Sequence, residues 1–197
     1  AIDQMENRGG VPICSPAYKE YDPSVGRMSA MPAGVYENGG IYNHACAFKV
    51  MADCKLGRAD QAVNTLLKMI PDGKDNPSSV TTTEPYVFTN CYLQNECENM
   101  MVGFSWQTGS SAWGLRDFYE GILGIERLYD GLKIRPNIPG GWDKVTAVRP
   151  YRGSTLNLTY VNCNRGTVSL NVDGRKIDGD VILAFDDNAA HEITVEF

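Results

Sequence analysis

Histidine and closely spaced cysteine, the usual ligands of zinc, are scarce in this sequence. Only two histidines occur in 197 residues, and none of the six cysteines forms a CxxC pair, so no metal site is expected. Basic residues are also in the minority, with 18 Lys and Arg against 24 Asp and Glu. Without a basic stripe, neither a nucleic acid nor an anionic membrane is an expected partner. No apolar run approaches the ~18 residues of a membrane span.

The remaining composition, 43% hydrophobic and 21% charged, is typical of a globular protein of one or two domains. Cys46 and Cys54 alternate with apolar residues on one predicted helix. We interpret them as buried, reduced thiols, which favours a cytoplasmic location and argues against a disulfide between Cys91 and Cys97. The polar start at Ala1, with neither Met nor an apolar signal stretch, favours a segment of a longer chain.

The first 130 residues have a mainly helical pattern after an irregular start. Four prolines spaced through residues 1–38 exclude a long helix there. A helical apolar stripe predicts a helix over 39–56, with Ile41, Ala45, Phe48 and Ala52 on one face. A second helix is predicted over 60–70, and Gly57 supplies the stop between the two, so they form an αα-hairpin.

Two further segments before residue 130 have an apolar or a capping pattern. Residues 85–92 are apolar, and a short helix is one interpretation of them. A later helix is predicted to run through 113–123, with Thr108 or Ser110 as its N-cap. Glu84, next to Pro85, is interpreted as a structural residue that holds its loop into a site.

From Gly131 on, apolar and polar residues alternate. Strands are predicted over 132–135, 145–148, 156–161, 167–172, 181–185 and 192–196, with turn signals between them. An all-β end of this kind is most simply a sandwich, and its boundary falls after Asp130. His191 is expected at the surface of the last strand, and the acidic residues of 178–187 are expected to be solvated.

A polar segment with a Gly-Gly pair leads into the first predicted helix at residues 37–44. Glycines let a ligand approach the backbone, and a helix N-terminus favours an anion. Glu37 is a candidate for hydrogen bonds to sugar hydroxyls or for acid or base chemistry, with a simple cap as the alternative. His44 is a candidate anion ligand, with a structural histidine as the alternative.

Hydroxyl side chains gather in a second segment, residues 105–111, at the start of the later helix. Hydroxyls and backbone N–H groups there form a potential anion cradle. Trp106 is a candidate platform for the apolar face of a sugar, and an ordinary cap with core tryptophans is the alternative. Together the two segments predict two helix N-termini that face one anion.

These segments, taken in order, resemble glycoside hydrolase family 94, the cellobiose phosphorylase family. The resemblance spans about residues 12–153 and rests on runs at 26–29, 37–45, 56–62, 83–87, 106–109, 122–125, 129–134, 138–139 and 142. It implies an α+β multidomain fold, in which residues 1–130 are the carboxy-terminal part of an (α/α)6 catalytic barrel with active-site loops. Residues 131–197 are then a jelly-roll-like β-sandwich domain.

The same resemblance implies the roles of individual residues. His44, Thr108 and Gly109 correspond to the phosphate-binding residues of the family, and Asn90 stands where many members have a phosphate-side Gln. In the family the equivalent of Glu37 contacts sugar hydroxyls.

Two more residues are assigned to the sugar. Tyr36 stands where many members of the family have Lys, and Trp106 opens the motif that contains Thr108. Both are expected on the sugar side of the site. The departures from the family pattern at Tyr36 and at Asn90 are both expected to alter sugar preference.

The implied activity is the inverting, reversible phosphorolysis of a β-linked gluco-oligosaccharide, with cellobiose or cellodextrin the first expectation, to an α-sugar 1-phosphate. Inorganic phosphate is a co-substrate and no cofactor is expected. An inverting hydrolase needs two carboxylates, whereas a phosphorylase needs only the acid, because phosphate is already a nucleophile. That acid, an Asp, is expected in an upstream half of the barrel, so no catalytic residue is assigned here. A homodimer is a further expectation.

Two other classes of function remain open. One is an (α/α)6 glycoside hydrolase that uses Glu37 as acid or base, and product formation without phosphate would indicate it. The other is a non-catalytic carbohydrate-binding module, indicated by unchanged phosphate affinity after substitution of His44 and Thr108.

Overall fold

The computed structural model describes residues 2–70, 76–85, 87–94, 100–164 and 166–197. The fold is α+β and divides into two compact units, Ala1–Leu56 with Gln61–Asp117, and Gly57–Asp60 with Phe118–Phe197. The domain boundary after residue 130 stays a prediction, as do the barrel and the jelly roll. Within these described ranges, no helix is both long and apolar enough to cross a bilayer.

Residues 2–38, the described part of the proline-rich start, contain two short helices, α1 (Ile2–Met5) and α2 (Arg27–Ala30), and no long one, as the prolines predict. Its loops are held by a fully buried amide, Asn38, rather than by regular structure. The Oδ1 atom of Asn38 accepts from the backbone N–H of Tyr18 at 2.7 Å, and its Nδ2 donates to the carbonyls of Tyr18 and Met31 at 2.9 and 2.7 Å. Backbone groups that a helix or sheet would pair are thus satisfied by one side chain.

The predicted αα-hairpin is confirmed by α3 (Asn43–Lys55) and α4 (Ala59–Met69). Gly57 follows α3 with φ 70°, the left-handed conformation that ends many helices. The apolar stripe that predicted the first helix is not its buried face, because Phe48 is 50% exposed and Ala52 is exposed. The buried residues of α3 are Asn43, Cys46, Ala47, Lys49, Val50, Asp53 and Cys54.

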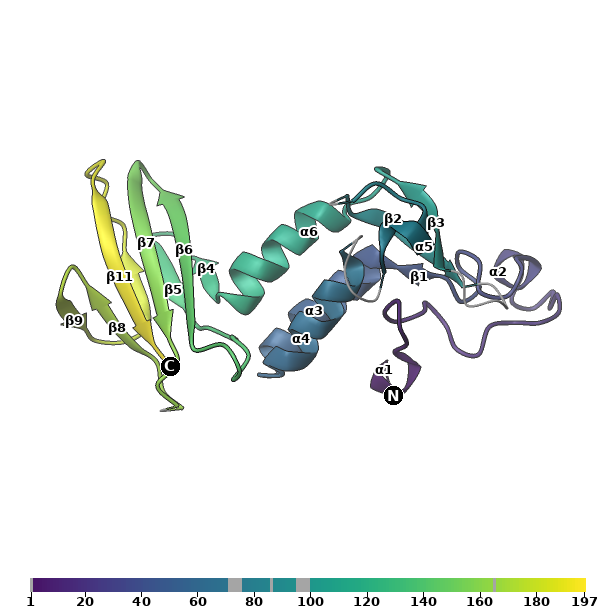
Figure 1. Ribbon diagram of the computed structural model, residues 1–197, viewed down its shortest axis with the longest axis horizontal. Coiled ribbons are helices and arrows are strands. Elements are labelled where there is room, and N and C mark those ends of the chain that lie inside the picture. The colour runs from purple at the N-terminus through teal and green to yellow at the C-terminus, as the bar shows by residue number, and fades with distance from the viewer. Residues whose placement is uncertain (1, 71–75, 86, 95–99, 165) are drawn as a thin grey trace. The chain divides into compact units, whose positions relative to one another are not determined.

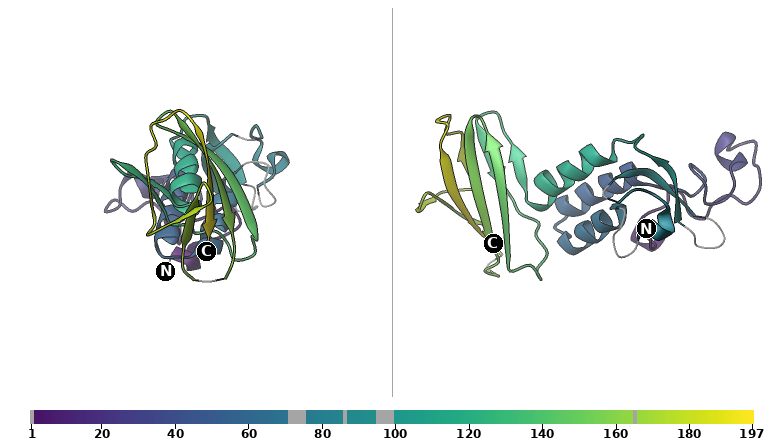
Figure 2. Two further views of the ribbon diagram at one scale, coloured as in Figure 1. Left: turned by 90° about the vertical axis from the view of Figure 1, so that its left-hand side faces the viewer. Right: turned by 45° about the horizontal axis from the view of Figure 1, so that its top comes forward.

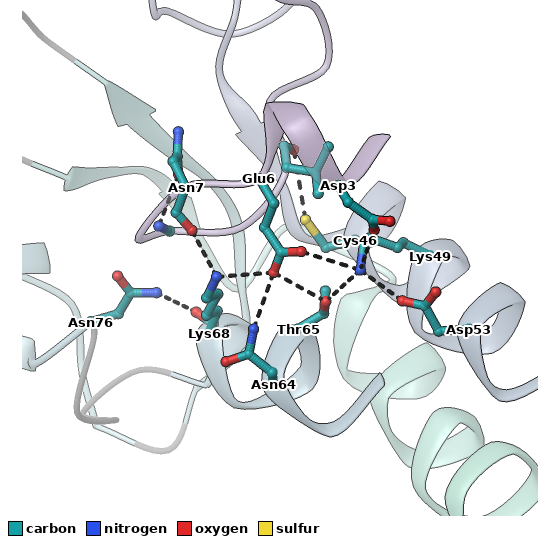
Figure 3. A network of polar contacts seen from close by, with 12 residues as sticks. Asp3, Glu6, Asn7, Cys46, Lys49, Asp53, Asn64, Thr65, Lys68 and Asn76 are labelled. Atoms are coloured by element: carbon teal, nitrogen blue, oxygen red, sulfur yellow. Dashed lines mark hydrogen bonds and ion pairs between the residues drawn. The ribbon is translucent and has the colours of Figure 1, made fainter. Parts of the chain in front are cut away.

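A buried charge network explains why the hydrophobic pattern of α3 was misleading (Figure 3). The Lys49 ammonium lies 2.7 Å from Asp53 Oδ2, 2.9 Å from Thr65 Oγ1 and 3.3 Å from Glu6 Oε2. Lys68 of α4 donates to the same Glu6 carboxylate at 2.9 Å. Burial by itself raises the pKa of Glu6, but Lys68 and Lys49 outweigh it and lower that pKa below its usual range. Charges face inwards here because every one has a partner.

The first unit also contains a three-stranded antiparallel sheet of β1 (Ile41–Tyr42), β2 (Thr89–Gln94) and β3 (Met100–Ser105). The helical interpretation of 85–92 is wrong, since residues 89–92 lie in β2, and Tyr86 lies outside the described residues. Pairing with β3 on one side and β1 on the other decided the conformation of a segment too short to show a period. The short helix α5 (Ser78–Thr81) lies beside β3 (Figure 1).

The predicted later helix is present as α6 (Ser110–Arg116), which continues into the π-helical turn η1 (Asp117–Ile122). Neither predicted N-cap residue holds that place, because Gly109 is the N-cap and no side chain caps the helix. The hydroxyl groups of Thr108 and Ser110 instead form a hydrogen bond with each other. In Figure 2, α6 runs beside α3, with which it packs.

The described residues of the second unit form two sheets. The smaller has the order β10 (Val181–Leu183), β5 (Gly131–Ile134) and β4 (Ile125–Arg127). The larger has the order β6 (Lys144–Tyr151), β7 (Ser154–Val161), β11 (Ala190–Glu196), β8 (Ser169–Val172) and β9 (Arg175–Ile177). All six predicted strands are confirmed, and β4 and β9 are additional. Alternation is clearest in β7, where Leu156, Leu158 and Tyr160 are buried.

The expectation of a surface position for His191 is wrong, because only 8% of the residue is exposed. Its Nδ1 lies 2.7 Å from Asp173 Oδ2 and its Nε2 lies 3.1 Å from Asp187 Oδ2, while the ring stacks on Phe185 with centroids 3.5 Å apart. The hydrogen bond with Asp173, supported by Asp187, raises the pKa of His191. The Ala189 N–H and then His191 lower the pKa of Asp187 to about 2. Histidine is buried here because two carboxylates compensate it.

The acidic segment 178–187 is therefore only partly solvated, contrary to expectation. Asp180 accepts from Arg135 Nε at 2.8 Å, and Asp187 also accepts from Ser154 Oγ at 2.8 Å. These hydrogen bonds join residues that lie 45 and 33 positions apart in the sequence. They therefore hold the acidic segment against other parts of the second unit.

Candidate phosphate site

His44, the second residue of α3, lies against the loop that precedes α6. A Cβ atom added to Gly109 would lie 3.4 Å from His44 Cε1 and 3.7 Å from each ring nitrogen. The rings of Phe48 and Trp113 flank the imidazole, with centroids 4.9 and 6.1 Å away. The two segments singled out in the sequence, 65 positions apart at His44 and Gly109, thus meet in one place.

The Nε2 atom of His44 is buried and has no hydrogen-bond partner within the described part of the chain. Buried polar atoms are nearly always paired, and an unpaired one needs an explanation. Because residue 109 is a glycine, no side chain stands between the imidazole and the backbone of this loop.

Thr108 and Ser110 lie on either side of Gly109 and share their hydroxyl groups. Thr108 Oγ1 lies 2.5 Å from Ser110 Oγ and accepts from the Ser110 backbone N–H at 3.0 Å. Ser110 Oγ in turn donates to the Thr89 carbonyl at 3.3 Å. Ser110 is fully buried, whereas Thr108 is half-buried and Gly109 is exposed. The ligand-accessible part of the loop is therefore Thr108 and Gly109.

Sequence reasoning missed the residues that tie the two segments together. Asn43, directly before His44, donates from Nδ2 to Thr89 Oγ1 at 2.8 Å and to the Thr89 carbonyl at 3.2 Å. Both Asn43 and Thr89 are fully buried. A buried chain of polar groups, Asn43–Thr89–Ser110–Thr108, thus connects the start of α3, the start of β2 and the start of α6. A polar Asn at a helix start was the only sequence signal for it.

The residues assigned to the sugar lie outside the strands, with Tyr36 and Glu37 in the loop before β1 and Trp106 directly after β3. Burial, followed by the charge and hydrogen bond of Glu37, raises the pKa of the Tyr42 phenol to about 12. Glu37 itself is exposed, so its carboxylate is open to a ligand. Tyr36 stacks on Phe104 of β3, with ring centroids 5.6 Å apart at 25°. Its φ of 47° is uncommon for a residue with a bulky side chain and holds the loop in an unusual conformation.

Trp106 follows β3 with φ 69°, and 68% of it is exposed. Its indole Nε1 donates to Glu84 Oε1 at 3.2 Å. The backbone of Glu84 and then the Trp106 indole lower the pKa of the Glu84 carboxyl. Glu84 thus orients an exposed aromatic face, in keeping with its structural interpretation.

Asn90 also holds this loop. Its Nδ2 donates to the backbone carbonyl of Gln107 at 2.8 Å. The amide is therefore engaged with the residue next to Thr108.

Comparison with known proteins gives the class to which this fold and site belong. Residues 2–124 match the model of a catalytic domain, that of the Glycosyl hydrolase 94 superfamily. The chain belongs to this family, as its motifs indicated.

Curated relatives agree with the family match. The chain is 39% identical over its whole length to a solabiose phosphorylase and 32% identical to a 3-O-beta-D-glucopyranosyl-beta-D-glucuronide phosphorylase, both from Paenibacillus borealis. It is 31% identical over 81% of its length to a cellobionic acid phosphorylase from Neurospora crassa. These matches cover 26%, 26% and 20% of the relatives, so the chain spans about a quarter of their length.

Proposed function

We propose that this chain is the phosphate-binding, carboxy-terminal part of an inverting glycoside phosphorylase. The complete enzyme would reversibly cleave a β-linked gluco-oligosaccharide with inorganic phosphate and release an α-sugar 1-phosphate. The observation that carries the proposal is the buried, unpaired His44 Nε2 beside Gly109.

The chemistry divides naturally between this chain and an upstream part of the enzyme. Phosphate attacks the anomeric carbon directly, so no second carboxylate has to activate water. The attacking anion must be held beneath that carbon with its charge compensated. Nε2 of His44, the Thr108 hydroxyl and the Gly109 backbone suit this task, because each offers a hydrogen bond to an oxyanion. The general acid that protonates the leaving oxygen belongs, in this proposal, to the upstream part.

The sugar would lie on the side of Glu37, Tyr36 and Trp106. Glu37 offers an exposed carboxylate to sugar hydroxyls, and Trp106 offers an exposed ring that Glu84 orients. Asn90 acts through the Gln107 carbonyl and is assigned to positioning of the phosphate loop.

The test is phosphate-dependent product formation by the complete enzyme that contains this chain. His44→Asn and Thr108→Val should each raise the phosphate KM by roughly tenfold or more, the loss of one charge-assisted hydrogen bond. Ser79→Ala removes an exposed hydroxyl on α5, outside both candidate segments, so it is the matched control and should leave the phosphate KM unchanged. Product formation without phosphate would identify a hydrolase instead. Unaltered phosphate affinity in both variants would favour a non-catalytic module.

Substrate identity follows from a panel of disaccharides. Cellobiose and cellodextrin are our first expectation, but the named relatives act on solabiose, a glucosyl glucuronide and cellobionic acid. The panel should contain all of these disaccharides, and the one with the highest kcat/KM identifies the preferred substrate.

The proposal extends to architecture and location. We assign α3, α4 and α6 to the carboxy-terminal part of an (α/α)6 barrel, which an upstream half would complete, and the second unit to a jelly-roll-like domain. A homodimer is expected, and its mass in solution tests this. Five cysteines of the described residues are free thiols, which supports a cytoplasmic location: Cys14, Cys46, Cys54, Cys91 and Cys163. Cys97 lies outside the described residues.

A further inference from the structure

The hydroxyl protons around Thr108 show an arrangement that phosphate binding has to change. Each hydroxyl has a single proton to donate. Ser110 Oγ directs its proton to the Thr89 carbonyl, which can only accept. Either oxygen can donate in the 2.5 Å contact between the two hydroxyls. In the state in which Ser110 donates to Thr89, the proton of that contact comes from Thr108. In this state the Thr108 hydroxyl points its proton inwards, at Ser110, and not towards a ligand.

A phosphate oxygen next to Thr108 can only accept a hydrogen bond, and it repels the lone pairs of the Thr108 hydroxyl. Thr108 must therefore direct its O–H bond towards the phosphate. Ser110 can release it without any loss of contact between the two hydroxyls. If the Ser110 proton turns from the Thr89 carbonyl to Thr108 Oγ1, the Thr108 proton becomes available to the ligand. No proton leaves its oxygen, so the exchange is a rotation of two O–H bonds.

The surroundings make this rotation favourable. The Thr89 carbonyl keeps the hydrogen bond from Asn43 Nδ2 at 3.2 Å after Ser110 turns away. The Ser110 backbone N–H continues to hold Thr108 Oγ1 at 3.0 Å, so the oxygen does not move. A hydroxyl that accepts hydrogen bonds is also a stronger donor, and the effect is larger in a buried chain of groups.

We propose that Ser110 is a positioning residue for phosphate, whose hydroxyl turns from the Thr89 carbonyl to Thr108 when the oxyanion docks. The inference rests on the proposed function, because it assigns the donor that supports Thr108 in that site. Ser110 does not touch phosphate in this mechanism. Its effect must pass through the Thr108 hydroxyl, and this makes the proposal separable from a purely structural role.

A double-mutant cycle in the complete enzyme, with inorganic phosphate as the varied substrate, tests this. Ser110→Ala should raise the phosphate KM by about three- to tenfold, with the disaccharide KM changed by less than about twofold. In a Thr108→Val background, Ser110→Ala should add less than about 1.5-fold, because the group it supports is already absent. Ser79→Ala, which removes an exposed hydroxyl on α5 away from the site, is the control.

Ser110→Cys guards against a folding artefact at this fully buried position, because the thiol fills the space but is a weak hydrogen-bond donor. It should match Ser110→Ala in phosphate KM while it keeps the thermal stability of the parent. Effects of Thr108→Val and Ser110→Ala that multiply, or that fall equally on both substrates, would overturn the proposal. If His44→Asn and Thr108→Val leave the phosphate KM unchanged, the proposed function itself fails. If they raise it and Ser110→Ala does not, only the role of Ser110 fails.

Discussion

Replacement of Lys49 by methionine should strongly destabilise the first unit. The Lys49 side chain is 7% exposed and lies 2.7 Å from the 4% exposed carboxylate of Asp53. It also lies 3.3 Å from Glu6. Methionine has a similar length but no charge, so Asp53 would be left buried without this cation. Breakage of a buried ion pair from one side costs about 3–5 kcal/mol, and we expect a loss of that size in the free energy of unfolding.

Urea-induced unfolding followed by circular dichroism measures this loss. Lys55→Met is the matched control, because Lys55 lies on the same helix but is exposed. The control should change the free energy of unfolding by less than about 0.5 kcal/mol. Since both variants remove one positive charge, the difference between them isolates the effect of burial.

A second variant separates the charge left behind from the packing lost. In Lys49→Met combined with Asp53→Leu, the buried carboxylate is removed together with its partner. Replacement of both ions by apolar side chains is often neutral or stabilising, so the double variant should be more stable than Lys49→Met alone. Equal losses for Lys49→Met and Lys55→Met, or a double variant less stable than the single one, would refute the reasoning.

Three further predictions concern separate parts of the molecule. Gly109→Ala should fold normally, because its φ of −82° suits any residue, but its methyl group 3.4 Å from the His44 ring should raise the phosphate KM of the complete enzyme at least tenfold by our estimate. His191→Gln should lower the melting temperature most near pH 5 and least at high pH. The pKa of His191 is raised in the folded state, so its protonated ring stabilises the fold fully below the unfolded pKa of about 6.5, and this stability is lost as the pH rises through the folded pKa. A difference in melting temperature that does not change with pH would contradict this. Gly34→Ala should cost more than about 3 kcal/mol in urea unfolding, since its φ is 81° and the new Cβ would overlap a backbone carbonyl, whereas Gly57→Ala at φ 70°, with no atom within 4 Å, should cost only about 1–2 kcal/mol.

Local patterns in the sequence were reliable where one face of an element is apolar. The alternation of β7 and the turns around it predicted the strands of the second unit, because a strand with one buried face repeats every two residues. The αα-hairpin was predicted from the apolar face of α4 and from Gly57, which ends the preceding helix. The same reasoning failed on α3, whose buried face includes Lys49 and Asp53. A hydrophobic pattern cannot reveal that two charges will be buried together.

The candidate site shows the same division. The motifs identified His44, Thr108 and Gly109, because histidine, hydroxyl groups and glycine at helix starts suit an anion. They did not identify Thr89, which lies in a segment interpreted as helical and proved to be a strand. Its partner Asn43 lies 46 positions away, and no periodicity relates residues at that separation.

The sequence by itself determined the αα-hairpin, the six predicted strands of the second unit, the family and the residue types of the site, because these depend on short repeats and on motifs within a few positions. Only the tertiary structure decided which polar groups meet. The Lys49 network, the aspartates around His191 and the hydrogen-bond chain from Asn43 to Thr108 all join distant segments. Their partners are chosen by the packing of whole elements, since a buried polar group must find its hydrogen bond wherever the fold places one.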